Sequence, residues 1–251
     1  MQKTGIEWAT MTWNPVTGCL NNCQYCYARK IANRFESSLE TFQKKMISSE
    51  YVGKNNECYQ GEYHCPFPFG FEPTFYKERL IEPQHVKNPQ RIFVCSMADL
   101  FGPWVPDEWI IYIFDACKAS PQHKYMFLTK FPERYVELAK VRLLPKLDNF
   151  WYGQSISNGT AKAFFGQYHQ FVSAEPLFGV VDPWGFDLVI IGAETGNRKD
   201  KIIPSEGTIG LTKYHSRCPV FMKDSLIPII GESKMIRQLP EELLLPGEEN
   251  V

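Results

Sequence analysis

Runs of apolar residues alternate with amphipathic stretches along most of the chain. Residues 92–94 and 188–191 are continuously apolar, which is typical of strands that are covered on both faces. In 107–119 the apolar residues recur at helical spacing, which predicts an amphipathic helix. The pattern predicts strands at 11–16, 74–77, 91–95, 125–129, 150–154, 170–174, 188–192 and 220–223. It predicts helices at 27–35, 107–119, 132–141, 161–169 and 207–216.

Strands that alternate with helices imply parallel pairing through right-handed crossovers. Seven or eight such units in 251 residues predict an α/β fold, a partial or complete (β/α) barrel in a single domain that covers 1–251. A doubly wound open sheet is the structural alternative. Residues 37–89 fit the alternation poorly because they are polar and contain several prolines. We interpret them as an insertion after the first β/α unit, in the role of a lid.

Charge and composition exclude some classes of protein. The chain has 27 Lys and Arg against 28 Asp and Glu, and 44% of its residues are hydrophobic, so it is not a disordered chain. This balance also argues against a uniformly basic nucleic-acid-binding surface, although a local basic groove remains open. We expect no export signal, no contact with a membrane and a cytoplasmic location, where thiols stay reduced. The eight cysteines therefore need an explanation other than disulfides.

Three of these cysteines form a C-x3-C-x2-C motif, Cys19, Cys23 and Cys26, between the first predicted strand and the first predicted helix. Iron–sulfur clusters are held by thiolates, ordinarily four for a 4Fe–4S cluster. Three thiolates on one short loop would leave the fourth iron open, and an open iron can chelate the amino and carboxylate groups of a small molecule. A structural zinc site and an electron-transfer ferredoxin centre are alternatives, but each needs a fourth ligand. Cysteines without any metal are the third alternative.

Polar residues follow almost every predicted strand. Active sites of β/α barrels are built at the carboxyl ends of the strands, and the cysteine motif follows the first strand, so it belongs to the same end. Loops are polar in any fold, so the set supports a site better than any one position does. The strand-end residues that we select are Ser96, Asp99, Lys130, Gln154, Ser155, Glu175 and Glu194.

The cysteine motif, with Tyr25 before its last cysteine, resembles the signature of the radical S-adenosylmethionine (SAM) superfamily. Six segments resemble the phage-type three-Cys-motif family within it: 13–19, 26–28, 91–101, 128–130, 175–177 and 192–196. The similarity extends over nearly the whole chain. The resemblance implies a partial or complete β/α barrel that carries the motif after its first strand.

The resemblance also implies a mechanism. The three cysteines would hold a 4Fe–4S cluster whose open iron binds SAM. One electron, from a donor such as a flavodoxin or a ferredoxin, would cleave SAM to a 5′-deoxyadenosyl radical that abstracts hydrogen from a substrate. The substrate is unknown; a nucleotide or a nucleic-acid base is one candidate, and a partner protein is another expected participant. Of the cofactor-binding residues, Tyr25 can stack on adenine, Lys130 can pair with the SAM carboxylate, and Glu175 or Glu194 can accept from its hydroxyls or ammonium.

Other cysteines give further hypotheses. Cys95 stands where it could face a substrate and donate a hydrogen atom, or be a small buried apolar residue. Cys58, His64 and Cys65 could form an auxiliary metal site or be loop residues without a metal. Two other functions stay open beside the enzyme: a metal-stabilised nucleic-acid-binding module that contains zinc or an iron–sulfur cluster, and a redox relay or sensor.

Overall fold

An eight-stranded sheet forms the centre of the protein. The computed structural model describes residues 1–34, 47–52, 58–61, 67, 69–164 and 167–250, with the backbone alone at 47–52 and 58–61. The strand order is β1-β2-β7-β8-β9-β11-β13-β14, and every pair is parallel except β1–β2. The strands span Gln2–Lys3 (β1), Met11–Trp13 (β2), Arg91–Val94 (β7), Lys124–Thr129 (β8), Phe150–Ser155 (β9), His169–Ala174 (β11), Leu188–Ile191 (β13) and Val220–Met222 (β14).

From β2 to β14 the strands lie in the sheet in the order in which they occur along the chain. A doubly wound sheet reverses its strand order at a switch point, so that alternative is wrong and the predicted α/β fold with parallel pairing is confirmed. No strand pair joins β14 to β1 or β2 within the described residues, so the sheet has two edges there. The α-helices span Tyr27–Arg34 (α1), Asp107–Lys118 (α3), Glu133–Lys140 (α4), Glu206–His215 (α5) and Ile227–Ile230 (α6), and 3₁₀ helices span Lys77–His85 (η1), Asp224–Leu226 (η2), Glu232–Lys234 (η3) and Glu241–Leu243 (η4).

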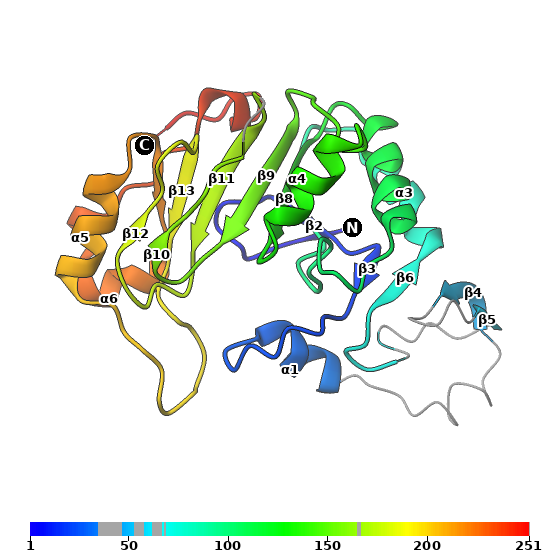
Figure 1. Cartoon of the computed structure of the whole chain (residues 1–251), viewed down its shortest axis with the longest axis horizontal. Coiled ribbons are helices and arrows are strands. Elements are labelled where there is room, and N and C mark those ends of the chain that lie inside the picture. The colour runs from blue at the N-terminus through cyan, green and yellow to red at the C-terminus, as the bar shows by residue number, and fades with distance from the viewer. Residues whose placement is uncertain (35–46, 53–57, 62–66, 68, 165–166, 251) are drawn as a thin grey trace.

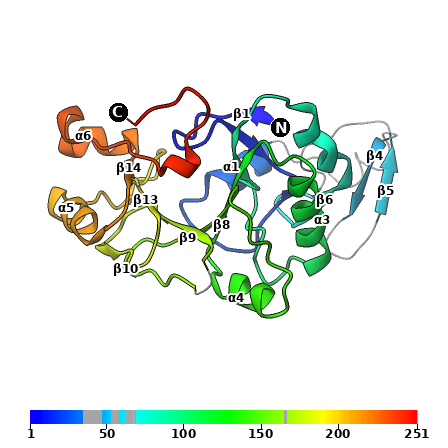
Figure 2. The ribbon, with the colours of Figure 1, turned by 90° about the horizontal axis from the view of Figure 1, so that it is seen from above.

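Both faces of the sheet are buried. In β8, Tyr125 and Phe127 belong to the core cluster shared with α3, while Met126 belongs to a second cluster with Trp8 on the opposite face. Helices α4, α5 and α6 lie outside the strands, and the C-terminal segment crosses near the N-terminal residues (Figure 2). Arg91 ties these terminal segments to the sheet because its guanidinium donates to the carbonyl oxygens of Trp8 and Leu243. Burial on both faces explains the continuously apolar strands.

The predicted strand at 11–16 is two strands. β2 ends at Trp13, and β3 (Val16–Thr17) belongs to a separate sheet of order β3-β6-β4-β5. Pro15 has no N–H to donate to a ladder, which favours a break here. The side chain of Asn14 turns toward the end of β7, where its Oδ1 accepts hydrogen bonds from the Ser96 hydroxyl and the Met97 N–H.

The predicted helix at 161–169 is wrong for the residues described there. Residues 161–164 are irregular, and His169 already begins β11. The side chain of Gln170 accepts a hydrogen bond from Phe164 N and donates one to Phe164 O, both at 2.8 Å, so it binds the backbone groups that a helix would use. Two further short strands, β10 (Gly159–Thr160) and β12 (Val181–Asp182), pair in parallel with each other in a separate two-stranded sheet.

Residues 37–89 are described only in part. The described portion contains β4 (Ile47–Val52), β5 (Cys58–Gly61), β6 (Thr74–Tyr76) and η1, outside the central sheet. Phe67 and Phe71 pack with Cys19 and the buried alanines of α1. This segment therefore supports the cysteine loop, and its role as a lid stays a prediction. No helix in the described part of the chain has the length and apolar character needed to cross a membrane.

Candidate functional site

The cysteine loop runs from Gly18 to Cys26, between β3 and α1. Two backbone hydrogen bonds fix its start: Gly18 N donates to Met97 O at 2.9 Å, and Cys19 N donates to Phe71 O at 3.0 Å. The loop ends in a turn in which Cys26 N donates to Cys23 O. In Figure 1 the arrowhead of β9 points toward the side of the sheet where α1 lies. The loop is therefore at the carboxyl end of the parallel strands, as expected.

The three thiols of this loop are free and lie near one another. Cys19 is buried, whereas Cys23 and Cys26 are half-buried. The pKa of the Cys19 thiol is raised to about 12, mainly by burial and to a smaller extent by the negative charges of Asp99, Cys26 and Cys23. A Cys19 thiolate in this environment therefore needs a cation beside it, as a coordinated metal provides.

A cavity of about 470 Å³ lies between the loop and the ends of the strands, a volume in the usual range for a small-molecule site. The three motif cysteines line it together with most of the residues selected as cofactor-binding. The predicted residues that the structure brings together at this cavity are Cys19, Cys23, Tyr25, Cys26, Ser96, Asp99, Lys130, Ser155, Glu175 and Glu194.

Lys130 and Asp99 occupy the wall formed by β7 and β8. The Lys130 ammonium donates to the hydroxyls of Tyr25, at 3.1 Å, and Ser155, at 3.0 Å. It forms no ion pair among the residues that the structure describes. Asp99 is 6% exposed, and burial raises the pKa of its carboxyl even though it accepts hydrogen bonds from the Thr129 hydroxyl and Lys130 N. Through these two hydrogen bonds, Asp99 fixes the backbone at the carboxyl end of β8, where Lys130 follows the strand.

Two carboxylates on the opposite wall already have cationic partners. Glu175 pairs with Lys223, which follows β14. Glu194 accepts two hydrogen bonds from Arg198, each at 2.7 Å, and these bonds lower the pKa of its carboxyl. The side chain of Glu194 is only 2% exposed. Both carboxylates can still accept hydrogen bonds from a ligand, but neither adds an uncompensated charge to the cavity.

The deep end of the cavity is apolar. Trp8, Phe93 and Leu128 line it, and the rings of Trp8 and Phe93 are 4.8 Å apart. Ser173 is 3% exposed and also lines the cavity. Sequence reasoning did not select Trp8, Ser173 or Lys223 as site residues. Of these three, only Lys223 could have been found from the sequence, because it stands at the end of a predicted strand. Trp8 precedes the first predicted strand, and Ser173 lies inside another.

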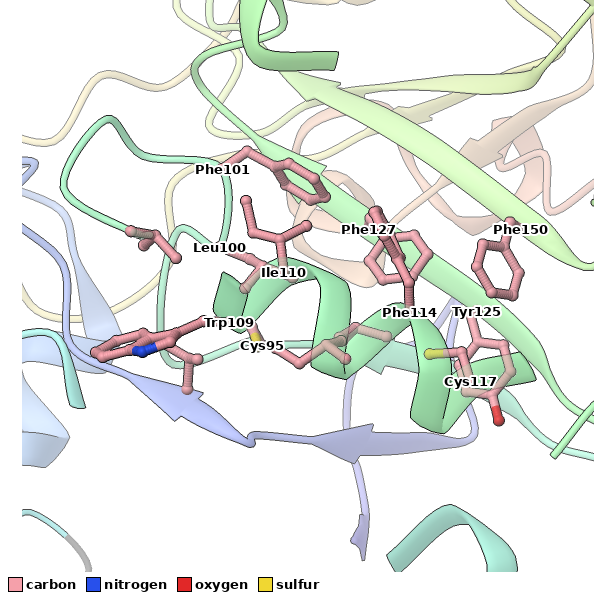
Figure 3. Packing of buried hydrophobic residues seen from close by; sticks show 14 of the residues in the cluster. Cys95, Leu100, Phe101, Trp109, Ile110, Phe114, Cys117, Tyr125, Phe127 and Phe150 are labelled. Carbon is pink, nitrogen blue, oxygen red and sulfur yellow. The ribbon is translucent and has the colours of Figure 1, made fainter. Parts of the chain in front are cut away.

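Cys95 lies in the apolar core and not at the cavity. It is 2% exposed and packs in the cluster that contains Trp109 and Cys117 (Figure 3), and burial raises the pKa of its thiol to about 12. This placement fits the small buried residue and not a hydrogen donor to a bound substrate. Gln154 is also absent from the cavity lining, and its Oε1 accepts a hydrogen bond from Lys162 N. Neither residue therefore enters the functional proposal.

Other predicted ligands lie outside the described residues: His64, Cys65 and the side chain of Cys58. Among the described residues, no group of three or more His, Cys, Asp and Glu side chains is arranged to hold a metal ion. Such a group converges on one ion, whereas the thiolates of an iron–sulfur cluster bind separate iron atoms.

The donor chemistry of the loop fits a cluster. Three thiols face one cavity, whose described lining contains no fourth cysteine and no histidine. Beside them, Nε of Arg29 is buried and has no hydrogen-bond partner among the described residues. The sulfur atoms of a cluster could accept hydrogen bonds, as this buried N–H group requires. The residues present thus supply three thiolate ligands, which fit a 4Fe–4S cluster.

Comparison with known protein families gives a match over most of the chain. The family described as "Protein of unknown function (DUF5131)" matches residues 3–206, which cover β1 to the start of α5. Neither the curated proteins nor the solved structures contain a match to the chain. The matched residues include the cysteine loop and every cavity residue named above except Lys223. Because the match covers far more than half of its length, the chain belongs to the DUF5131 family.

Proposed function

We propose that this protein is a radical SAM enzyme built on a partial (β/α) barrel. The observation that carries the proposal is that the C-x3-C-x2-C loop and the polar strand ends line one cavity at the carboxyl end of the parallel strands. The sequential order from β2 to β14, with helices on the outside, also favours such a barrel over an open doubly wound sheet.

Cys19, Cys23 and Cys26 would hold the 4Fe–4S cluster, and SAM would bind beside it. When bound, the cluster supplies the one-electron cleavage of SAM to a 5′-deoxyadenosyl radical that abstracts hydrogen from the substrate. An electron donor such as a flavodoxin or a ferredoxin is required. A nucleotide or a nucleic-acid base is a candidate substrate.

The residues of the cavity bind and orient. Lys130, held by two hydroxyls and free of an ion pair in the described part of the chain, is placed to bind the SAM carboxylate. Glu175 and Glu194 accept hydrogen bonds from the ribose hydroxyls or the ammonium. Trp8 and Phe93 close the deep end and exclude water, which protects a reactive intermediate from side reactions.

Anaerobic reconstitution with iron and sulfide tests the proposal. The wild-type chain is expected to bind about four iron atoms and, with SAM and a reductant, to release 5′-deoxyadenosine. The Cys23→Ala variant is expected to lose both properties. Cys218→Ala is the matched control because Cys218 is half-buried and lies outside the cavity.

Three outcomes would refute the proposal that the protein is a radical SAM enzyme. A chain that is stable in air with zinc and does not turn over SAM would indicate a metal-stabilised module. Binding of nucleic acid that is independent of SAM and survives in air, with a steep dependence on salt and without turnover of SAM, would indicate a metal-stabilised nucleic-acid-binding module. A reversible electron couple that SAM does not perturb would indicate a redox relay or sensor.

A further inference from the structure

Arg29 makes a set of contacts that all end on the cysteine loop or on the segment that supports it. Its Nη2 donates to Cys19 O at 3.0 Å and to Asn21 O at 3.1 Å. Its backbone N donates to Cys26 Sγ at 3.4 Å, so the sulfur caps the first turn of α1. Its guanidinium carbon lies 4.9 Å from the centre of the Phe71 ring. One residue thus contacts both ends of the motif, through its side chain at Cys19 and through its backbone at Cys26.

Together with Phe71, Arg29 fixes both backbone groups of Cys19. The N–H of Cys19 donates to Phe71 O, and the carbonyl of Cys19 accepts from Arg29. The planar guanidinium can bridge two carbonyls and stack on a ring at the same time. A lysine in its place is a point charge that cannot do both. The direction of the Cys19 side chain therefore depends on the guanidinium group and not only on a positive charge at this position.

Arg29 also brings a positive charge and an unused donor to the loop. Its Nε is buried and, within the part of the chain that the structure describes, has no hydrogen-bond partner. Reduction potentials of iron–sulfur clusters depend on nearby charge and on hydrogen bonds to their sulfur atoms. A cation that stays beside the cluster favours the reduced, more negative state.

We propose that Arg29 is a positioning residue of the cluster site, with two effects. Its guanidinium group fixes the backbone of Cys19 through Nη2, and its positive charge makes the bound cluster easier to reduce. The second effect rests on the proposed function. The first concerns the chain itself and is independent of any metal.

The first effect is tested on the metal-free protein by thiol alkylation, with the modified cysteines identified by mass spectrometry. Arg29→Lys is expected to speed alkylation of Cys19 by at least about tenfold, the equivalent of one hydrogen bond to a charged group. Arg34→Lys, the same exchange at an exposed position later in α1, is the matched control and is expected to leave the rate unchanged. Equal rates in the wild type and Arg29→Lys would overturn this effect.

A second variant separates loop positioning from general unfolding. Phe71→Leu keeps an apolar side chain in the cluster with Cys19 but removes the ring contact of Arg29, and it is expected to speed alkylation of Cys19 by a smaller factor than Arg29→Lys. Cys117, which lies in a different core cluster, serves as the internal reference in every variant. Alkylation of Cys117 that rises in parallel with that of Cys19 would mean global unfolding and would overturn the positioning role.

The second effect is tested by redox titration of the reconstituted cluster, followed by electron paramagnetic resonance. Arg29→Met removes the charge and is expected to move the midpoint to a more negative potential, whereas Arg29→Lys is expected to stay closer to the wild type. Equal midpoints in all three proteins would overturn this effect while leaving the enzyme proposal intact. Failure of the wild type to load a cluster would instead refute the proposed function and the charge effect, and alkylation would still decide the positioning role.

Discussion

Replacement of Gly18 by alanine is expected to displace the cysteine loop. Gly18 precedes the first motif cysteine and has a φ of +86°, a region that residues with a side chain rarely adopt. A Cβ at this position would lie 2.1 Å from Glu72 O and 2.8 Å from Phe71 O, which are backbone atoms and cannot rotate away. The clash can be relieved only if the chain at 71–72 moves away from the loop, which breaks the hydrogen bond from Cys19 N to Phe71 O.

The expected loss of folding stability in Gly18→Ala has two contributions. The left-handed conformation costs a residue with a Cβ about 1–2 kcal/mol. Overpacking against a rigid neighbour costs about 1–3 kcal/mol. The sum, about 2–5 kcal/mol, is a large part of the stability of an average domain, about 5–15 kcal/mol. Urea unfolding of the metal-free variant should show this loss, and iron analysis after anaerobic reconstitution should show that the loop no longer retains a cluster.

Gly247→Ala is the control that isolates the clash. Gly247 has the same φ of +86°, but nothing lies within 4 Å of its Cβ position. This variant should therefore lose only the conformational term and should bind as much iron as the wild type. The reasoning fails if Gly18→Ala and Gly247→Ala have the same urea midpoint, or if Gly18→Ala keeps its iron.

Three further variants probe the cavity walls. Lys130→Met should weaken anaerobic binding of radiolabelled SAM by about 10- to 100-fold because a charge-assisted hydrogen bond is lost; unchanged binding would remove the lysine from the site. Gly192→Ala places a Cβ 3.1 Å from Lys223 and 3.2 Å from Glu175, so SAM affinity should fall while the urea midpoint changes little. The carboxyl of Glu194 has a lowered pKa, so its ion pair stabilises the fold above the ordinary value of 4.5 and loses that contribution as the pH falls through the folded value. The stability advantage of the wild type over Glu194→Gln should accordingly shrink as the pH falls from 7 to below 4.5, and a constant difference would contradict the assignment.

The architecture could be predicted because burial on both faces leaves a clear pattern. Continuously apolar segments such as β13 are rare outside covered parallel strands, and the helix α3 shows its apolar stripe. The failures have local causes that periodicity does not record. The hydrogen bonds between the Gln170 side chain and the backbone of Phe164 prevent a helix there, and the break at Pro15 moves β3 to another sheet.

The cavity could be predicted in outline because parallel strands end at one side of the sheet. That rule brought Ser96, Lys130 and Glu175 to the motif cysteines. It failed for Cys95, because a residue at a strand end can point into the helix layer as easily as into the cavity. The contacts of Arg29 could not be predicted either, because they depend on carbonyl groups of the loop and not on side-chain type.

The charges of the cavity, taken together, limit what can bind beside the cysteines. The carboxylates of Glu175 and Glu194 are each neutralised by a cation, and both oxygens of Asp99 accept hydrogen bonds from the protein. Lys130 differs from these groups because, in the described part of the chain, its partners are two neutral hydroxyls. The charge of Lys130 acts on the nearby Asp99 carboxyl and lowers its pKa, but Lys130 has no ion pair in the described part of the chain. An ammonium without an ion pair favours a ligand that carries a negative charge. The cavity therefore favours a ligand whose anionic group lies beside Tyr25 in the cysteine loop. The carboxylate of the proposed SAM would meet that requirement at this point of the site.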